Sequence, residues 1–229
     1  MFASGILNIW MHDPLDVAEQ AAALFAAHPD RFLLGLGVSH QTIVESGTGR
    51  RYERRYEVMV EFLDALDGAP TPTPTPNRAL AALGPRMLRL AATRSLGAHP
   101  YCVPVSHTAA ARAVLGDGPL FAPELKVVLE RDPDSARSIV RAHLARYLAS
   151  PNYVNNLLRL GYRAADLVDG GTDDVVDSLV CWGGPDAVAE RVSAHRDAGA
   201  DHVCIQVLTA DNTHFPLAQW RSLAPAIIT

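Results

Sequence analysis

Apolar positions along the chain form short runs that alternate with amphipathic stretches. The run from Phe32 to Val38 is continuously apolar or glycine, which is typical of a parallel strand covered on both faces. The stretches between such runs repeat apolar residues with helical spacing, and two of them open on the helix-start pairs Asp13-Pro14 and Asp132-Pro133. The pattern therefore predicts parallel strands joined by helices, an α/β fold.

Six strands can be placed on this pattern, at residues 5–10, 32–38, 79–83, 98–103, 123–130 and 202–208. The first helix starts at Asp13, and Leu15, Ala18, Ala22 and Phe25 fall on one face of it. Further helices are expected around 56–66 and at 85–95, 106–115, 133–148, 153–160, 173–182, 185–198 and 215–228. Six parallel strands fit either an open doubly wound sheet or a (β/α)₈ barrel that lacks two units.

Two segments interrupt the alternation within what we expect to be a single domain, residues 1–229. Residues 68–77 alternate proline with threonine, which favours an extended surface connection over an inner strand. A docking peptide for a partner that recognises proline is the alternative. Residues 151–182 predict a helical insertion with loops around Gly170-Gly171.

Composition narrows the class of protein. Of the 229 residues 48% are hydrophobic and 20% are charged, and the net charge of −5 argues against a basic surface for nucleic acid. No apolar run has the length of a membrane span, and residues 1–4 do not resemble a signal peptide, so we expect a cytoplasmic protein. The scattered cysteines, Cys102, Cys181 and Cys204, are expected to be buried, unreactive thiols.

Two glycine-bearing turns carry the candidate ligand site. The first is Gly35-Leu36-Gly37-Val38-Ser39-His40, and the second is Leu83-Gly84-Pro85-Arg86-Met87. Ligands of parallel α/β proteins bind where strands end, and glycine there lets a ligand approach the backbone. A helix that begins at Pro85 offers free N–H groups to a phosphate. We therefore expect a large phosphorylated cofactor, with Gly84 as the phosphate contact and Arg86 adding charge. A simple helix start is the alternative.

His40 is the titratable side chain placed directly at the end of a predicted strand. An imidazole ordinarily titrates near neutral pH, so His40 is a candidate catalytic proton donor or acceptor, and a surface loop histidine is the alternative. The other histidines near strand ends lack the spacing of metal ligands, so no metal site is expected. Neither a dinucleotide-binding glycine motif nor an esterase elbow occurs in the sequence.

The order of these segments resembles the bacterial luciferase-like superfamily, in particular its actinobacterial branch that depends on the deazaflavin coenzyme F-420. The matching segments are Gly5-Ile6-Leu7-Asn8-Ile9-Trp10 with Asp13-Pro14, residues 31–40, residues 82–88, Gly183-Gly184-Pro185 with the helix after it, and residues 197–203. Together they span nearly the whole chain.

The resemblance implies a TIM-type barrel that binds flavin or deazaflavin at the carboxyl ends of its strands. It also implies that family members begin with two more β/α units than this sequence has. In those members a polar residue, often histidine, ends the second strand, and this sequence has no equivalent of that residue. Gly5-Ile6 matches the position of a non-prolyl cis peptide bond. The Asn8 amide matches a place from which it bonds a ring carbonyl, or else caps a turn. The expected cofactor contacts are Gly5, Ile6, Asn8, Val38, Ser39, His40, Leu83, Gly84, Arg86 and Met87.

The function that follows from the resemblance is an oxidoreductase that uses coenzyme F-420 to exchange hydride with a small organic substrate. An FMN-dependent monooxygenase is the alternative within the enzymes. A non-catalytic, shortened barrel that binds a flavin or serves a structural role is the alternative of another class.

An incomplete barrel leaves its first and last strands as edges, with unpaired backbone groups beside apolar residues such as Ile6, Ile9, Val203 and Ile205. Because neither strand carries lysine or proline to blunt its edge, we expect a homodimer, or a larger even assembly, that covers the open side. Its interface should exceed about 2,000 Å².

Overall fold

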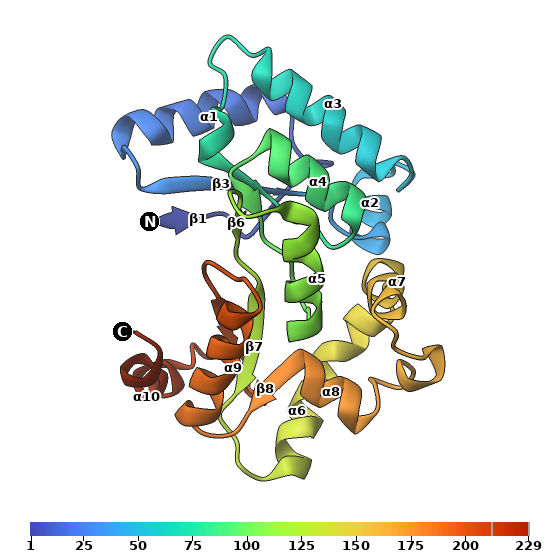
Figure 1. The fold of residues 1–229 in the computed structure, drawn as a ribbon. Coiled ribbons are helices and arrows are strands. Elements are labelled where there is room, and N and C mark those ends of the chain that lie inside the picture. The colour runs from blue at the N-terminus through green and yellow to red at the C-terminus, as the bar shows by residue number, and fades with distance from the viewer. Residues whose placement is uncertain (212, 229) are drawn as a thin grey trace. The chain divides into compact units, whose positions relative to one another are not determined.

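A computed structural model describes residues 1–211 and 213–228 of the chain. They form two compact units, which are described separately (Figure 1). Unit 1 comprises residues 1–99 and 114–120, and unit 2 comprises residues 100–113 and 121–229. The expectation of a single domain stays a prediction.

Unit 1 is built on a parallel sheet with β3 next to its edge. The strands follow the order β1-β3-β4-β5-β6. The strand β2 pairs with Leu36 and Gly37 of β3, which follow the residues that pair with β1. Their bounds are β1 (Phe2–Ala3), β2 (Leu7–Asn8), β3 (Phe32–Gly37), β4 (Arg78–Leu80), β5 (Gly97–Ala98) and β6 (Leu120–Phe121), whose second residue already belongs to unit 2. In register, Asn8 lies opposite Gly37, and Leu36 lies opposite Leu80. The carboxyl ends of β2, β3 and β4 therefore lie along one edge of the sheet.

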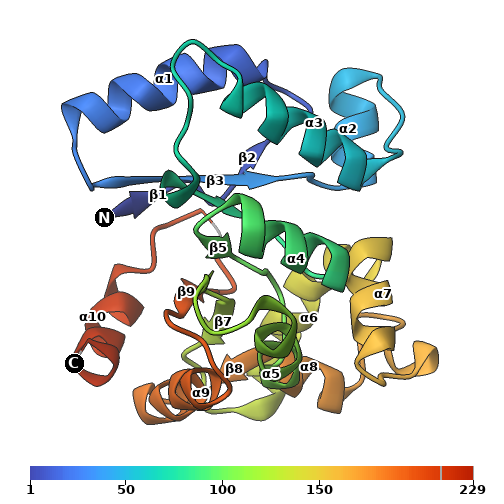
Figure 2. The ribbon, with the colours of Figure 1, turned by 45° about the horizontal axis from the view of Figure 1, so that its top comes forward.

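The helices of unit 1 are α1 (Pro14–Ala27), α2 (Gln41–Thr48), α3 (Arg55–Asp67) and α4 (Pro85–Arg94), with a 3₁₀ turn η1 (Thr75–Asn77) in the proline-rich connection. Asp13 caps α1 as predicted, because its carboxylate accepts the Leu15 N–H at 2.8 Å. Figure 2 shows α1 and α3 side by side over one face of β3. The residues of β3 after Phe32 are buried, which confirms a strand covered on both faces.

Unit 2 contains a three-stranded parallel sheet in the order β8-β7-β9. Its strands are β7 (Glu124–Val128), β8 (Val180–Trp182) and β9 (Cys204–Val207). Its helices are α5 (Val105–Leu115), whose end belongs to unit 1, α6 (Pro133–Leu148), α7 (Pro151–Arg159), α8 (Asp173–Leu179), α9 (Pro185–Asp197) and α10 (Leu217–Ile227), with a 3₁₀ turn η2 (Ala164–Asp166). Within the described residues, β9 is an edge that pairs with β7 alone.

Three local predictions about helices are wrong. The helix expected to Trp182 ends at Leu179, since Val180, Cys181 and Trp182 pair with β7 as β8. The helix expected at 106–115 begins one residue earlier, at Val105, so Ser106 lies inside the helix and does not cap it. On α1 the buried residues are Val17, Ala18 and Ala21, whereas Leu15 is 52% exposed.

Two further features bear on the class of protein. No helix within residues 1–211 and 213–228 is long and apolar enough to cross a membrane. Cys102 and Cys181 are buried and Cys204 is half-buried, and all three are free thiols. Burial raises the pKa of all three thiols, that of Cys102 to about 11, which agrees with the prediction of unreactive cysteines.

Candidate cofactor site

The peptide bond between Gly5 and Ile6 is cis, as the resemblance implied. The Ile6 side chain crosses the face of β3, and a Cβ atom on Gly37 would collide with its Cδ1 and Cγ1 atoms. A Cβ on Gly35 would collide with the Ser4 carbonyl oxygen. The glycines of β3 therefore make room for the chain around the cis bond. The interpretation that Gly35 and Gly37 admit a ligand to the backbone is wrong, because Ser4 and Ile6 fill that space.

Asn8 lies at the carboxyl end of β2, opposite Gly37. Its Oδ1 atom accepts the backbone N–H of Trp10 at 3.1 Å, which closes the turn after the strand. Its Nδ2 atom is buried and has no hydrogen-bond partner within the described residues. Asn8 thus caps a turn through its oxygen and still offers an unused amide donor, so the two expected roles are compatible.

The segment after β3 turns sharply into a helix that the sequence pattern did not reveal. Ser39 has a left-handed backbone with φ of 59°, and its carbonyl accepts the Tyr52 hydroxyl at 2.5 Å. His40 is the residue before α2, and its carbonyl accepts the Val44 N–H at 3.0 Å. Val38, Ser39 and His40 are half-buried. His40 therefore lies at a helix start at the carboxyl edge of the sheet, and its catalytic role stays a prediction.

The turn after β4 opens α4 as predicted, with Gly84 before the helix and Pro85 in its first position. Within the described residues no side chain caps this helix start, and the N–H groups of Arg86 and Met87, in the first turn, have no partner inside the helix. Leu83, Gly84 and Met87 are half-buried. This is the geometry that an anionic group prefers, because the helix dipole adds to the free donors.

Arg86 has less freedom than predicted. Its guanidinium lies 3.3 Å from the Glu57 carboxylate and 4.2 Å from the centre of the Tyr56 ring. Both partners lie on α3, which packs against α4. Its positive charge is therefore partly neutralised by a neighbour within unit 1.

Register brings the predicted contacts together along one edge of unit 1. Asn8 follows β2, Ser39 and His40 follow β3, and Gly84 follows β4, and these three strands are adjacent and parallel. The edge combines an uncharged amide donor, an imidazole and an open helix N-terminus. Such a set suits an organic cofactor with a polar ring at one end and a phosphate at the other.

Sequence reasoning missed a buried ion pair in unit 2. The Lys126 side chain is 0% exposed, and its ammonium donates to Glu124 Oε2 at 2.7 Å. The same oxygen accepts the Cys102 N–H at 3.1 Å. The ammonium lies 3.6 Å from the centre of the Tyr101 ring and 5.0 Å from that of Tyr147. The sequence does contain a signal for this pair, because Glu124 and Lys126 stand at alternate positions of an apolar strand. Charged residues in such a strand are rarely buried unless they are paired.

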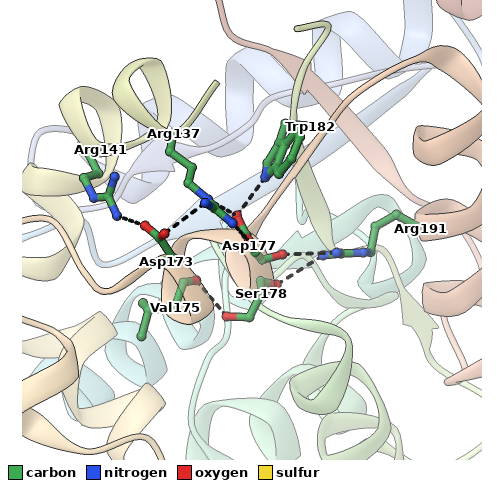
Figure 3. Close-up of polar contacts among 8 residues, drawn as sticks. All are labelled: Arg137, Arg141, Asp173, Val175, Asp177, Ser178, Trp182 and Arg191. Atoms are coloured by element: carbon green, nitrogen blue, oxygen red, sulfur yellow. Dashed lines mark hydrogen bonds and ion pairs between the residues drawn. The ribbon is translucent and has the colours of Figure 1, made fainter. Parts of the chain in front are cut away.

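A groove of about 440 Å³ on unit 2 was also missed, because it depends on how α8, β8 and α9 pack. Beside it, the Asp177 carboxylate accepts from Arg137 at 3.1 and 2.6 Å and from the Trp182 indole at 2.7 Å (Figure 3). Arg191 donates to the carbonyls of Asp177 and Ser178 at 3.1 and 3.3 Å. These groups bond to one another and hold the walls together. The groove is lined by Asp177, Val180, Cys181, Trp182, Ala187, Glu190, Arg191 and Ala194.

The described residues contain no cluster of three or more histidine, cysteine, aspartate or glutamate side chains that could hold a metal ion.

Parallel strands joined by helices, with the predicted contacts at the carboxyl ends of three of them, place the chain in the α/β class. The family model for luciferase-like monooxygenases matches residues 1–202, and the chain belongs to this family. No curated protein matches the chain.

Solved structures show the same fold at low sequence identity. An F-420-dependent secondary alcohol dehydrogenase in complex with an F-420-acetone adduct is 15% identical with a TM-score of 0.74, over 99% of this chain and 79% of that one. The coenzyme F-420-dependent tetrahydromethanopterin reductase from Methanopyrus kandleri is 18% identical with a TM-score of 0.67, over 90% and 76%.

A third similar structure contains FMN. The oxygenating constituent of 3,6-diketocamphane monooxygenase from Pseudomonas putida, a type II Baeyer-Villiger monooxygenase, is 14% identical with a TM-score of 0.62, over 99% and 79%. The fold of this chain is thus an incomplete luciferase-like TIM-type barrel, and the solved structures that share it are named as oxidoreductases and monooxygenases.

Proposed function

We propose that the chain is an oxidoreductase that binds the deazaflavin coenzyme F-420 and exchanges hydride with a small organic substrate. The observation that carries the proposal is the unused amide donor of Asn8, which lies on the same strand edge as the open start of α4. A ring carbonyl suits the first and a phosphate suits the second. Both similar structures with the higher TM-scores quoted above are named as F-420-dependent, which supports the choice.

Each residue of the edge has a role in this proposal. Asn8 Nδ2 donates to a carbonyl of the ring, and the N–H groups of Arg86 and Met87 bind the phosphate beside Gly84. Gly5 and Ile6 lie behind the ring and support it, and Val38, Ser39 and Leu83 contact its edges. His40 holds or releases a proton at the substrate oxygen, because an imidazole can do both near neutral pH. The bound coenzyme supplies the hydride chemistry itself.

The cofactor site is tested by Gly84→Val. A branched side chain there would occupy the space beside the free N–H groups, so we expect affinity for F-420 to fall by more than about tenfold. Gly118→Val is the matched control, since a Cβ at Gly118 meets no atom within 4 Å and this glycine lies in the same unit. Equal affinities of the two variants, with unchanged far-UV circular dichroism, would remove Gly84 from the site.

An FMN-dependent monooxygenase is the second candidate. The match to the monooxygenase family model and the similar structure with FMN favour it. Parallel titrations with F-420 and FMN, followed by absorbance, separate the two candidates. Failure to bind either would support a non-catalytic, shortened barrel.

We also propose that the chain forms a homodimer in the cytoplasm. The three free thiols support a reducing compartment.

The dimer is supported by the open edge of unit 1. Within the described residues, β1 and β2 pair with β3 alone, and Met1 and Phe2 beside this edge are 77% and 72% exposed. A second copy that covers such an edge removes a site of aggregation. Light scattering at micromolar concentration should give twice the chain mass of 24.6 kDa, and a stable monomer would refute the dimer.

A further inference from the structure

Two buried N–H groups at the carboxyl end of β2 have no acceptor within the described residues, Asn8 Nδ2 and Trp10 Nε1. The orientation of the amide is fixed, because the Trp10 backbone N–H donates to Asn8 at 3.1 Å and only the oxygen can accept it. Nδ2 therefore has to find its acceptor elsewhere. Unpaired buried donors are uncommon in folded proteins, and two within three residues call for an explanation.

The indole of Trp10 is held in place beside the predicted cofactor contacts. Trp10 is 8% exposed, and its ring lies 5.9 Å from the Tyr52 ring at an angle of 47°. The Tyr52 hydroxyl in turn donates to the Ser39 carbonyl at 2.5 Å, in the turn after β3. Trp10 is thus tied to the ends of two neighbouring strands.

Trp182 shows how the same chain satisfies an indole elsewhere. Its Nε1 donates to the Asp177 carboxylate at 2.7 Å (Figure 3). Trp10 is more deeply buried than Trp182 and yet has no such acceptor within the described residues. The comparison points to an acceptor outside the described residues, such as an atom of a bound ligand.

We propose that Trp10 is a ligand-binding residue, and that its indole N–H and the Asn8 amide together receive an uncharged oxygen of a bound ligand. Both groups only donate and neither is charged, so a carbonyl or hydroxyl oxygen fits them better than a cation does. The oxygen belongs either to the cofactor ring or to a small ketone or alcohol substrate. Both nitrogens are covered in the free chain, so the side chains that cover them have to move when the ligand enters, while the Asn8 amide keeps its bond to the Trp10 backbone. The inference rests on the proposed function and adds a residue to it.

Indole ¹H–¹⁵N resonances test the proposal directly. The chain has three tryptophans, so three indole signals are expected, and single Trp→Phe variants assign them. Titrations use F-420, then FMN, then acetone added to the cofactor-loaded protein. We expect the Trp10 signal to move downfield while the Trp182 signal stays. Movement with the cofactor alone assigns the oxygen to the ring, and movement only after acetone assigns it to the substrate.

Trp10→Phe keeps the ring and removes the donor, so it should weaken binding of the responsible ligand by about five- to tenfold. Trp182→Phe is the control and should leave that affinity unchanged. Cofactor binding seen by absorbance with an unmoved Trp10 signal in every arm would overturn this inference and leave the proposed function standing. Absence of cofactor binding would overturn both. If Trp10→Phe does not fold, the resonance titration of the unaltered chain decides alone.

Discussion

Lys126→Met should destabilise unit 2 strongly, because it removes one partner of a buried ion pair. In the native chain the ammonium lies 2.7 Å from Glu124, and the two side chains are 0% and 4% exposed. The variant leaves a buried carboxylate whose Oε2 keeps only the Cys102 N–H, and whose Oε1 has no partner within the described residues. Methionine has nearly the length of lysine, so a cavity contributes little.

Removing one member of such a pair costs about 3–5 kcal/mol, which is a large share of the roughly 5–15 kcal/mol that stabilises a domain. Urea unfolding at pH 7 measures the change. In a Trp10→Phe background the remaining tryptophans, Trp182 and Trp220, lie in unit 2 and report on that unit alone.

The double variant Glu124→Leu/Lys126→Met is the control that separates charge from packing. It leaves no unpaired charge, so its stability should return to within about 1–2 kcal/mol of the native value or exceed it. A loss below about 1 kcal/mol in the single variant would contradict the reasoning. A double variant as unstable as the single one would show that packing around the lysine stem is what matters.

Two other perturbations of unit 2 have expected outcomes. Burial, with a smaller contribution from Arg191, lowers the pKa of His195 to about 4 from an ordinary value of 6.5. The folded protein therefore keeps its full stability above pH 6.5, and it loses roughly 3 kcal/mol as the pH falls from 6.5 toward 4, because the unfolded chain binds the proton more readily. His195→Gln should flatten the dependence of the melting temperature on pH in this window. Asp177→Ala removes the acceptor of the Trp182 indole and of two Arg137 nitrogens, although Arg137 keeps its bond to Asp173, and should cost about 1–3 kcal/mol in urea unfolding. Asp174→Ala, which changes an exposed aspartate on the same helix, should cost less than about 0.5 kcal/mol.

Much of the strand and helix pattern could be predicted from the sequence, because it is local. The apolar run of β3 and the Asp-Pro pairs that start α1 and α6 depend on burial and capping within a few residues. The cis bond at Gly5-Ile6 was predicted only by resemblance to a family, since nothing in the composition of that segment requires it.

The remaining features depend on contacts between distant segments. Gly35 and Gly37 look like a ligand-binding turn, but their space is taken by Ser4 and Ile6 about thirty residues earlier, which no local pattern reveals. The strand β8 follows α8 without a break because it pairs with β7, about fifty residues earlier. For the site, the sequence placed Asn8, His40 and Gly84 at strand ends. It did not predict that Arg86 pairs with Glu57.

Titration of the unaltered chain with F-420, and separately with FMN, tests the central claim most directly. Bound to unit 1, the cofactor should show a saturable change in its visible absorbance at one site per chain. The account predicts this change for F-420, with an affinity that Gly84→Val lowers by more than about tenfold. Saturation with FMN alone would favour the monooxygenase candidate. No change with either cofactor up to about 1 mM, a binding free energy weaker than about −4 kcal/mol, would contradict the account.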